Sequence, residues 1–181
     1  DDGFHISNCK GLIKIENSEF EGLLDDPINV HGTYVKIVEQ KGPRTILARF
    51  IHPQSVNLDF GWPGDEIGIS DNGTMLTVAT AKLKSVKHLN TTDILVTLDR
   101  DIPPSVKPGF ALENLTWTPS VELRNNFFGN GRARGVLVST PRKVVIERNR
   151  FESSGSAILI AGDNHEWFES GAVRDVLIRN N

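Results

Sequence analysis

The sequence predicts an all-β protein, a parallel β-helix with a small antiparallel β-barrel or sandwich inserted into it. Two observations support this prediction. Short strands rich in β-branched residues, separated by polar turns, recur every 23 or 24 residues, and a repeat of this length is typical of a solenoid in which each repeat makes one coil. Between Phe20 and Phe128, however, the spacing is 108 residues. Because one coil takes only about 23, roughly 85 residues must form a separate insertion.

The first two copies of the repeat lie at residues 1–6 and 25–30. Aligning them places Asp2 on Asp26, with a spacing of 24 residues that the rest of the two copies shares. Neighbouring coils stack like the strands of a parallel sheet, roughly 4.8 Å apart. The alignment therefore predicts that acidic side chains from two coils gather in one small region.

Further copies of the strand-and-turn pattern follow the insertion and match the earlier segment 13–20: residues 121–128, 144–151 and 176–181. These copies carry Asn126, Asn149 and Asn181 at one turn position, where the first copy has Ser18. Asparagine tolerates a left-handed backbone and can hydrogen-bond to the same position in the next coil. We therefore expect these residues to form a ladder along a stacked corner.

The insertion, approximately Lys36 to Thr118, has the pattern of a small antiparallel barrel or sandwich. None of it has a helical period, and its apolar runs are short strands separated by turns: 46–51, 75–79 and 94–98. Trp62 and Trp117 are expected in its core. The chain is thus predicted to have three segments, of which the outer two are β-helix coils: 1–35, 36–118 and 119–181.

The composition is that of an ordinary folded protein of 181 residues, with a net charge of −3 and a single cysteine. That charge argues against a nucleic-acid partner, which needs a basic surface. No apolar run approaches the ~18–20 residues of a membrane-spanning helix. Because the chain lacks an initiator methionine and its last residues follow a strand pattern, we expect it to be a piece of a longer protein.

The acidic column created by the repeat is the strongest candidate for chemistry. Asp2 and Asp26 share one position, the next coil places Arg134 there as a candidate substrate contact, and Asp25 is adjacent. Glycoside hydrolysis needs two carboxyl groups, one to donate a proton and one to activate water or to attack. Crowding of like charges raises the pKa of at least one of them and keeps it protonated near neutral pH. An inverting enzyme holds the two groups roughly 6.5–9.5 Å apart, a span that two adjacent coils can supply.

A purely structural role for these aspartates stays open, in which they cap turns and form a solvated ladder with Arg134. Strict alternation along the strands would point Asp2 and Asp26 toward the core, so a corner or bulge must turn them outward. Asp25 needs no such distortion.

The alignment places His5, Asn29 and His31 on the outward face beside the acids, where they would bind a hydroxyl or tune a pKa. An ordinary surface location explains the histidines equally well. No histidine or cysteine cluster with ligand spacing supports zinc, and a metal held by these carboxylates would have to be Ca²⁺. We expect neither a bound metal nor a cofactor.

A second excursion of about nine residues lies between 162 and 174, because Ile146 and Ile178 are 32 residues apart rather than 23. Long loops on a rigid scaffold often carry ligand contacts. Trp167 is therefore a candidate for stacking on a sugar ring, and Glu169 for accepting a hydrogen bond from a hydroxyl. Anchoring of the loop is the alternative role of both residues.

Residues 2–8, followed by Asp25 and Asp26, resemble the inverting β-helix hydrolases of the polygalacturonase type. The stretch 25–32, the inserted barrel-like segment and residues 167–171 resemble glycoside hydrolase family 110 more closely, which are bacterial exo-acting α-1,3-galactosidases. This resemblance covers essentially the whole chain. It implies a right-handed β-helix, an inverting and cofactor-free mechanism, and a secreted, periplasmic or cell-surface location. It also implies that Asp25 is the general acid, while Asp2 and Asp26 position and activate water.

Three readings of the function follow, and the first is an inverting exo-α-galactosidase acting on a glycan. The second is a polygalacturonase-like hydrolase or a Ca²⁺-dependent β-helix lyase. The lyase would hold the ion with the same acids and use Arg134 to abstract a proton. The polygalacturonase-type Gly-His-Gly is missing, since Val30 precedes His31 and Gly32, which favours a neutral sugar over a uronic acid. The third is a non-catalytic glycan-binding or structural β-helix, and the insertion would serve as an aglycone wall or a homo-oligomer contact.

Overall fold

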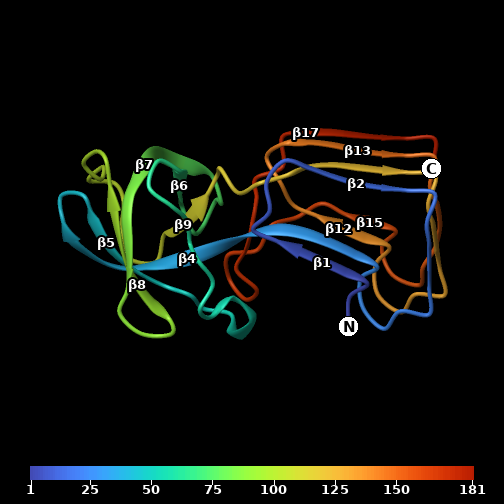
Figure 1. Ribbon diagram of the computed structural model, residues 1–181, viewed down its shortest axis with the longest axis horizontal. Coiled ribbons are helices and arrows are strands. Elements are labelled where there is room, and N and C mark those ends of the chain that lie inside the picture. Colours follow the sequence, from blue (N-terminus) through green and yellow to red (C-terminus); the bar gives the residue numbers. More distant parts are fainter. The chain divides into compact units, whose positions relative to one another are not determined.

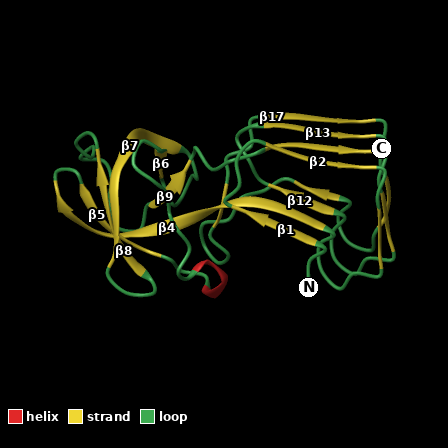
Figure 2. Ribbon diagram, in the orientation of Figure 1, coloured by secondary structure: helices red, strands yellow, loops and turns green.

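A computed structural model describes residues 1–181 as an all-β chain whose single helical element is the short 3₁₀ turn η1 (Pro53–Ser55) (Figure 2). The all-β prediction is confirmed. No helix is long and apolar enough to cross a membrane. The chain forms two compact units, which we call the coil unit (Asp1–Gly32, Thr118–Gly162 and Gly171–Asn181) and the barrel unit (Thr33–Trp117 and Asp163–Ser170).

The coil unit consists of three parallel sheets, with strand orders β1-β4-β12-β15, β2-β10-β13-β17 and β3-β11-β14 (Figure 1). Each turn of chain adds one strand to a sheet before it passes to the next. Their bounds are β1 (Phe4–Ser7), β2 (Leu12–Glu16), β3 (Glu19–Glu21), β4 (Ile28–Gly42), β10 (Ser120–Arg124), β11 (Phe127–Gly129), β12 (Val136–Val138), β13 (Lys143–Glu147), β14 (Arg150–Glu152), β15 (Ile158–Leu159) and β17 (Asp175–Arg179).

The strand registers match the sequence repeat. Phe4 pairs with Ile28, as the spacing of 24 residues predicts. Phe128 pairs with both Phe20 and Phe151, and these three rings are stacked, with centroids 5.1 and 4.8 Å apart. The rings belong to a core of aliphatic side chains from all three sheets that includes Ile28, Val121, Val136 and Ile146. The spacing of the repeats therefore fixed which strands lie side by side.

The predicted corner ladder is confirmed. The side-chain oxygen of Asn126 accepts a hydrogen bond from the Ser18 amide, and that of Asn149 accepts one from the Asn126 amide, each at 3.0 Å. Asn181 continues the series with the Asn149 amide at 2.9 Å. The left-handed backbone that we expected at these positions instead falls one residue earlier, at φ values of 52° to 55°: Asn17, Asn125, Arg148 and Asn180. The side chain of each ladder residue is aligned along the stack, and the residue before it adopts the left-handed backbone that turns the chain.

The barrel unit closes into a six-stranded antiparallel barrel with strand order β4-β5-β8-β7-β6-β9, in which β9 pairs with β4. Besides β4, its strands are β5 (Thr45–Arg49), β6 (Glu66–Ser70), β7 (Thr77–His88), β8 (Asp93–Leu98) and β9 (Ala111–Asn114), and β16 (Glu169–Ser170) also belongs to this unit. The long strand β4 pairs along its second half with both β5 and β9. This double pairing makes the insertion a barrel rather than a sandwich, and removes the free sheet edges.

Two sequence predictions for the barrel unit are wrong in detail. The strand expected to begin at Met75 begins at Thr77, because Asp71 caps a turn by accepting the amides of Gly73 and Thr74, and Met75 has a φ of 59°. Trp62, expected in the core, is 49% exposed. Aliphatic side chains of the strands fill the barrel instead.

Candidate functional site

The three candidate catalytic aspartates meet in the coil unit. Asp2 precedes β1, and Asp25 and Asp26 precede β4 on the next turn of chain. One carboxylate oxygen from each lies within 4.8 Å of the others. All three lie in connecting segments just before the strands, so strand alternation does not govern their direction. The separation of roughly 6.5–9.5 Å that we expected for an inverting pair is not found between these nearest oxygens.

Asp26 is the most enclosed of the three, with 1% of its side chain exposed. Its carboxylate accepts hydrogen bonds from Arg134 Nε at 2.7 Å and from Arg134 Nη2 at 2.6 Å. The Arg134 amide adds a third donor at 3.3 Å. A bidentate guanidinium pair of this kind holds a carboxylate in a fixed orientation. Asp26 is therefore suited to positioning, and Arg134, predicted as a substrate contact, is engaged in this pair.

Asp2 lies in a different environment. Burial raises the pKa of its carboxyl group above the usual range, His5 opposes this effect, and the negative charges of Asp25 and Asp26 add to it. A hydrogen bond from the Asn29 side chain acts in the opposite direction. Two carboxylates on the adjacent turn and a partly dry setting thus make Asp2 more basic than an exposed aspartate.

A chain of hydrogen bonds leads away from Asp2. Its Oδ2 lies 3.2 Å from His5 Nδ1, and His5 Nε2 lies 2.7 Å from His31 Nε2. His31 Nδ1 faces the Gly32 carbonyl, which only accepts, so His31 Nδ1 must carry a hydrogen. If both imidazoles are neutral, His5 donates to His31 through Nε2, and Asp2 must supply the proton between itself and His5. Transfer of that proton from Asp2 to His5 makes the histidine pair cationic and leaves Asp2 ionised, with no change in the number of protons.

The three polar candidates around the acids are more buried than we expected. His31 is 6% exposed and Asn29 is 5% exposed, whereas the sequence placed both on an outward face. Both still contact the acid cluster: Asn29 hydrogen-bonds to Asp2, and His31 pairs with His5. The side chain of His5 is 35% exposed. Asn29 and His31 therefore support the acids from beneath, and His5 alone of the three has substantial solvent contact.

Asp25 is held by a contact to one of its carboxylate oxygens. Its Oδ1 accepts a hydrogen bond from the Asp26 amide at 3.1 Å. Its side chain is partly exposed. The cluster thus combines three different settings: a carboxylate locked by arginine, a carboxyl group linked to histidine, and a partly exposed carboxyl group. Such separation of environments is what acid and base roles require.

Trp167 and Glu169 belong to the barrel unit. Asp163 organises their loop by accepting the amides of His165 and Trp167, each at 2.7 Å. Burial alone would raise the pKa of Asp163, but these amide bonds outweigh it and lower the pKa. Trp167 is 49% exposed, with its ring centroid 4.7 Å from that of His52. Glu169 pairs with Asp163 in an antiparallel bridge. These contacts support the alternative role of Trp167 and Glu169, which is to anchor the loop.

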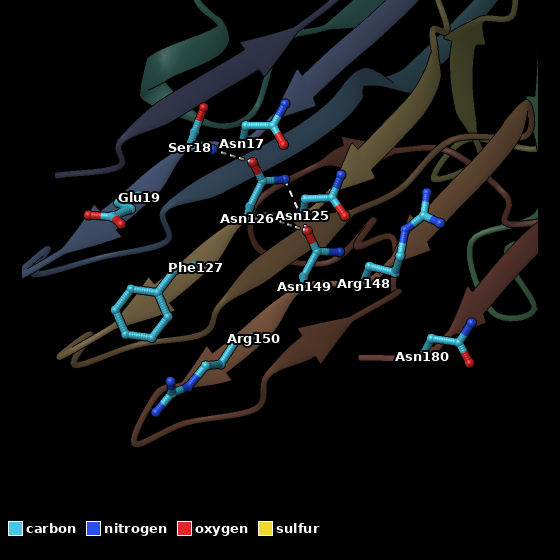
Figure 3. A pocket seen from close by; sticks show the side chains of 10 residues that line it. All are labelled: Asn17, Ser18, Glu19, Asn125, Asn126, Phe127, Arg148, Asn149, Arg150 and Asn180. Carbon is cyan, nitrogen blue, oxygen red and sulfur yellow. Dashed lines mark hydrogen bonds between the residues drawn. The ribbon is translucent and has the colours of Figure 1, made fainter.

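A hollow of about 580 Å³ lies along the stacked corner of the coil unit, and Figure 3 shows the residues that line it. The ladder of Ser18, Asn126 and Asn149 runs through it, joined by the hydrogen bonds drawn there. None of the candidate site residues lines this hollow. Its polar groups hydrogen-bond to one another along the stacked corner, so we interpret the hollow as a structural groove.

The coil unit also contains a column of alternating charges that was not predicted from the sequence. Glu16, Arg124, Glu147 and Arg179 occupy one register position on successive turns. Glu147 is 2% exposed and forms ion pairs with both Arg124 and Arg179. The alignment of the repeat copies contains this column, because the four residues share one place in the pattern. It shows how stacked turns neutralise their charges when no function intervenes.

Comparison with known proteins gives matches along the whole chain. The profile described as GLAA-B beta-barrel domain II matches residues 45–112, within the barrel unit. Alpha-1,3-galactosidase B of Bacteroides thetaiotaomicron is 53% identical over 181 residues, covering 100% of this chain and 29% of the relative. Alpha-1,3-galactosidase B of Phocaeicola vulgatus is 44% identical, covering 99% and 31%.

Alpha-1,3-galactosidase A of Bacteroides fragilis is 43% identical over 182 residues, which cover 99% of this chain and 30% of that relative. The chain therefore spans about three tenths of the length of the curated relatives it matches. The resemblance to the α-1,3-galactosidases that the sequence indicated is confirmed.

Proposed function

Because the chain is homologous along its whole length to bacterial proteins named alpha-1,3-galactosidase, we propose that it contributes the catalytic acids of a glycoside hydrolase. The substrate is a glycan that ends in α-1,3-linked galactose. The observation that carries this proposal is the meeting of Asp2, Asp25 and Asp26 within 4.8 Å of one another. Three carboxyl groups with one arginine among them form a cluster that is costly to hold without a use.

Each acid has a role that suits its contacts. Asp25, partly exposed, protonates the glycosidic oxygen as the bond to the anomeric carbon breaks. Asp2 accepts a proton from the attacking water, because its raised pKa makes it a better base. Asp26, held by Arg134, fixes the position of the neighbouring acids. The histidine pair next to Asp2 provides a path for the proton to leave.

We propose that the configuration at the anomeric carbon inverts, since water attacks directly and no aspartate forms a covalent bond to the sugar. The nearest carboxylate oxygens are closer together than the usual inverting separation of roughly 6.5–9.5 Å. Outward rotation of Asp25 around the substrate would widen this gap. The stereochemical outcome is therefore the decisive test of this part of the proposal.

The proposal extends to architecture and location. The three parallel sheets of the coil unit are taken to be part of a right-handed parallel β-helix, divided at 1–35 and 119–181 by a domain at 36–118. We place the enzyme outside the bacterial cytoplasm, as secreted, periplasmic or attached to the cell surface. His5, Asn29 and His31 support the acids, and Trp167 and Glu169 are candidate sugar contacts.

Proton NMR of the protein mixed with a Gal-α-1,3-Gal oligosaccharide tests the proposal. β-Galactose should appear first and convert slowly to the α anomer. First appearance of α-galactose would mean retention and a covalent role for one aspartate. If neither anomer appears with this sugar or with p-nitrophenyl α-galactoside, the hydrolase assignment is wrong for this chain.

A second candidate function rests on the same carboxylates, because Asp2, Asp25 and Asp26 are also close enough to bind one cation together. In a Ca²⁺-dependent lyase they would hold the ion, and Arg134 would remove a proton from a uronic acid. The bidentate pair of Arg134 with Asp26 disfavours this use of the arginine. Unsaturated products that disappear on chelation of Ca²⁺ would support the lyase, whereas activity indifferent to chelator would remove it.

A further inference from the structure

The barrel unit carries a rigid aromatic surface that the proposed hydrolysis does not use. The rings of Trp62 and Trp117 lie 5.0 Å apart between centroids, tilted by 37°. Trp62 is 49% exposed, and Trp117 is partly exposed. An exposed indole forgoes the free energy that burial would give. A fixed pair of such rings on a surface is typical of a binding site.

Asp65 holds the two tryptophans together. Its Oδ2 accepts three hydrogen bonds of 2.9 Å, from the Trp62 amide, from Trp117 Nε1 and from Asn114 Nδ2. One carboxylate oxygen thus fixes the backbone of the first ring and the indole nitrogen of the second. The orientation of the pair is set before any ligand arrives, which lowers the entropy cost of binding.

Asn114 supports this arrangement from beneath and is 6% exposed. Its Nδ2 also donates to the Phe60 carbonyl at 2.9 Å, and its Oδ1 accepts the Trp117 amide at 3.3 Å. A Cβ at Gly61 would lie 2.3 Å from Asn114 Nδ2. Only glycine allows the chain to pass this close, so residue 61 is part of the scaffold.

The turn at Trp62 adds a further restraint. The Asp65 amide donates to the Trp62 carbonyl at 3.0 Å, and Gly64 has a φ of 99°. Proline at the second position and glycine with positive φ at the third make a type II turn. Trp62 is thereby fixed by its amide and by its carbonyl.

We propose that Trp62 and Trp117 form a binding surface for a neutral galactoside. The axial hydroxyl of galactose leaves C–H groups together on one face of the sugar, and this face packs against an indole ring. The partly exposed Asp65 carboxylate lies beside the rings and accepts a hydrogen bond from a sugar hydroxyl. Its negative charge excludes uronic acids and sulfated sugars. The choice of galactose among neutral sugars rests on the proposed function, whereas binding of a galactoside here requires no cleavage of an α-linkage.

Lactose is the probe, since it contains a β-galactoside and no α-galactosidic bond. The chain has three tryptophans, so a ¹⁵N-labelled sample gives three indole N–H signals, assigned with Trp62→Phe and Trp167→Phe. Titration to about 50 mM lactose covers millimolar dissociation constants. The signals of Trp62 and Trp117 should shift together and with one dissociation constant, whether or not lactose also shifts Trp167, a candidate contact of the proposed catalytic site.

Variants distinguish the effect of removing the Trp62 ring from the effect of altering any exposed apolar side chain. Trp62→Ala should weaken lactose binding at least about tenfold, and Trp62→Phe by less, because a smaller ring is kept. Leu89→Ala is the matched control, as Leu89 is 48% exposed in the same unit and is not aromatic, and it should bind like the parent. Circular dichroism checks that each variant is folded.

Three results would overturn the proposal: no shift of the Trp62 and Trp117 signals at the highest lactose concentration, a shift of the Trp167 signal alone, or unchanged affinity in folded Trp62→Ala. Light scattering tests the competing occupant, a second copy of the chain. A dimer that Trp62→Ala dissociates, without lactose binding in the parent, would assign the surface to self-association instead.

Discussion

Two columns of charged residues run through the coil unit, and they differ in the order of their charges: one alternates in sign, and the other places like charges side by side. Glu16, Arg124, Glu147 and Arg179 alternate in sign on successive turns, so each charge has neighbours of opposite sign. The acidic column places Asp2 and Asp26 on adjacent turns with Asp25 beside them, where Arg134 pairs with Asp26 and His5 lies beside Asp2. Both columns arise from the same stacking of one turn on the next.

The difference shows what stacking can and cannot explain. Parallel stacking forces equivalent positions into contact, and alternating charge is the arrangement that makes this favourable. The charge column has that arrangement. The acidic column departs from it: burial raises the pKa of the Asp2 carboxyl group, and the charges of Asp25 and Asp26 add to that effect. A departure of this kind from local stability is typical of a functional site.

Arg134→Gln should produce the largest loss of stability, because it leaves Asp26 buried without its cation. Removing one partner of a buried ion pair costs about 3–5 kcal/mol, and urea denaturation at neutral pH measures the free energy of unfolding. Arg150→Gln is the control, since Arg150 pairs with Glu152 at an exposed site and should change stability by about 1 kcal/mol or less. Equal effects in both variants would contradict the account.

Glu147→Gln breaks the alternating column and should cost less, about 2 kcal/mol. The variant removes charge-assisted hydrogen bonds to Arg124 and Arg179, but the side chain of Arg179 is 56% exposed and can be hydrated. Thermal unfolding measures the change, and turnover at a temperature where the variant is folded should stay normal. A large loss of turnover in the folded variant would mean that this column is not merely structural.

Asp2→Asn should have the smallest effect on stability and the opposite sign. Because the folded-state pKa of Asp2 is raised, the folded protein binds more protons than the unfolded chain between the two pKa values. Stability therefore falls as pH rises through that interval. The variant lacks this loss, so it should match the parent below the ordinary aspartate pKa and be modestly more stable above it. Denaturation midpoints across the acidic range provide the test, and a less stable variant at neutral pH would show that Asp2 is a structural residue.

Much of the coil unit could be predicted from the sequence, because the repeat spacing dictates the register. The pairing of Phe4 with Ile28 and the ladder through Asn126 both follow from counting residues. The meeting of Asp2 with Asp26 follows in the same way. Spacing says nothing about how deeply a side chain is covered, and so the burial of Asn29 and His31 was missed.

The barrel unit was harder to predict, because its partners are set by pairing between distant strands. Closure by β4 and β9 depends on contacts with no periodic signal in the sequence. Trp62 was placed in the core on residue type alone, whereas Asp65 and the turn hold it on the surface. The cue was the Trp-Pro-Gly-Asp turn itself, which favours an exposed loop.

The most direct test of the central claim compares Asp25→Asn with the parent in both turnover and stability. If the cluster serves catalysis, hydrolysis of a Gal-α-1,3-Gal oligosaccharide should fall by about 10²–10⁴-fold, the range for loss of a general acid, while the unfolding midpoint is unchanged or higher. Asp175→Asn, an exposed aspartate of the same unit, should leave both quantities unchanged. An Asp25→Asn variant with normal turnover, or one that loses activity only because it unfolds, would contradict the claim and return the cluster to a structural role.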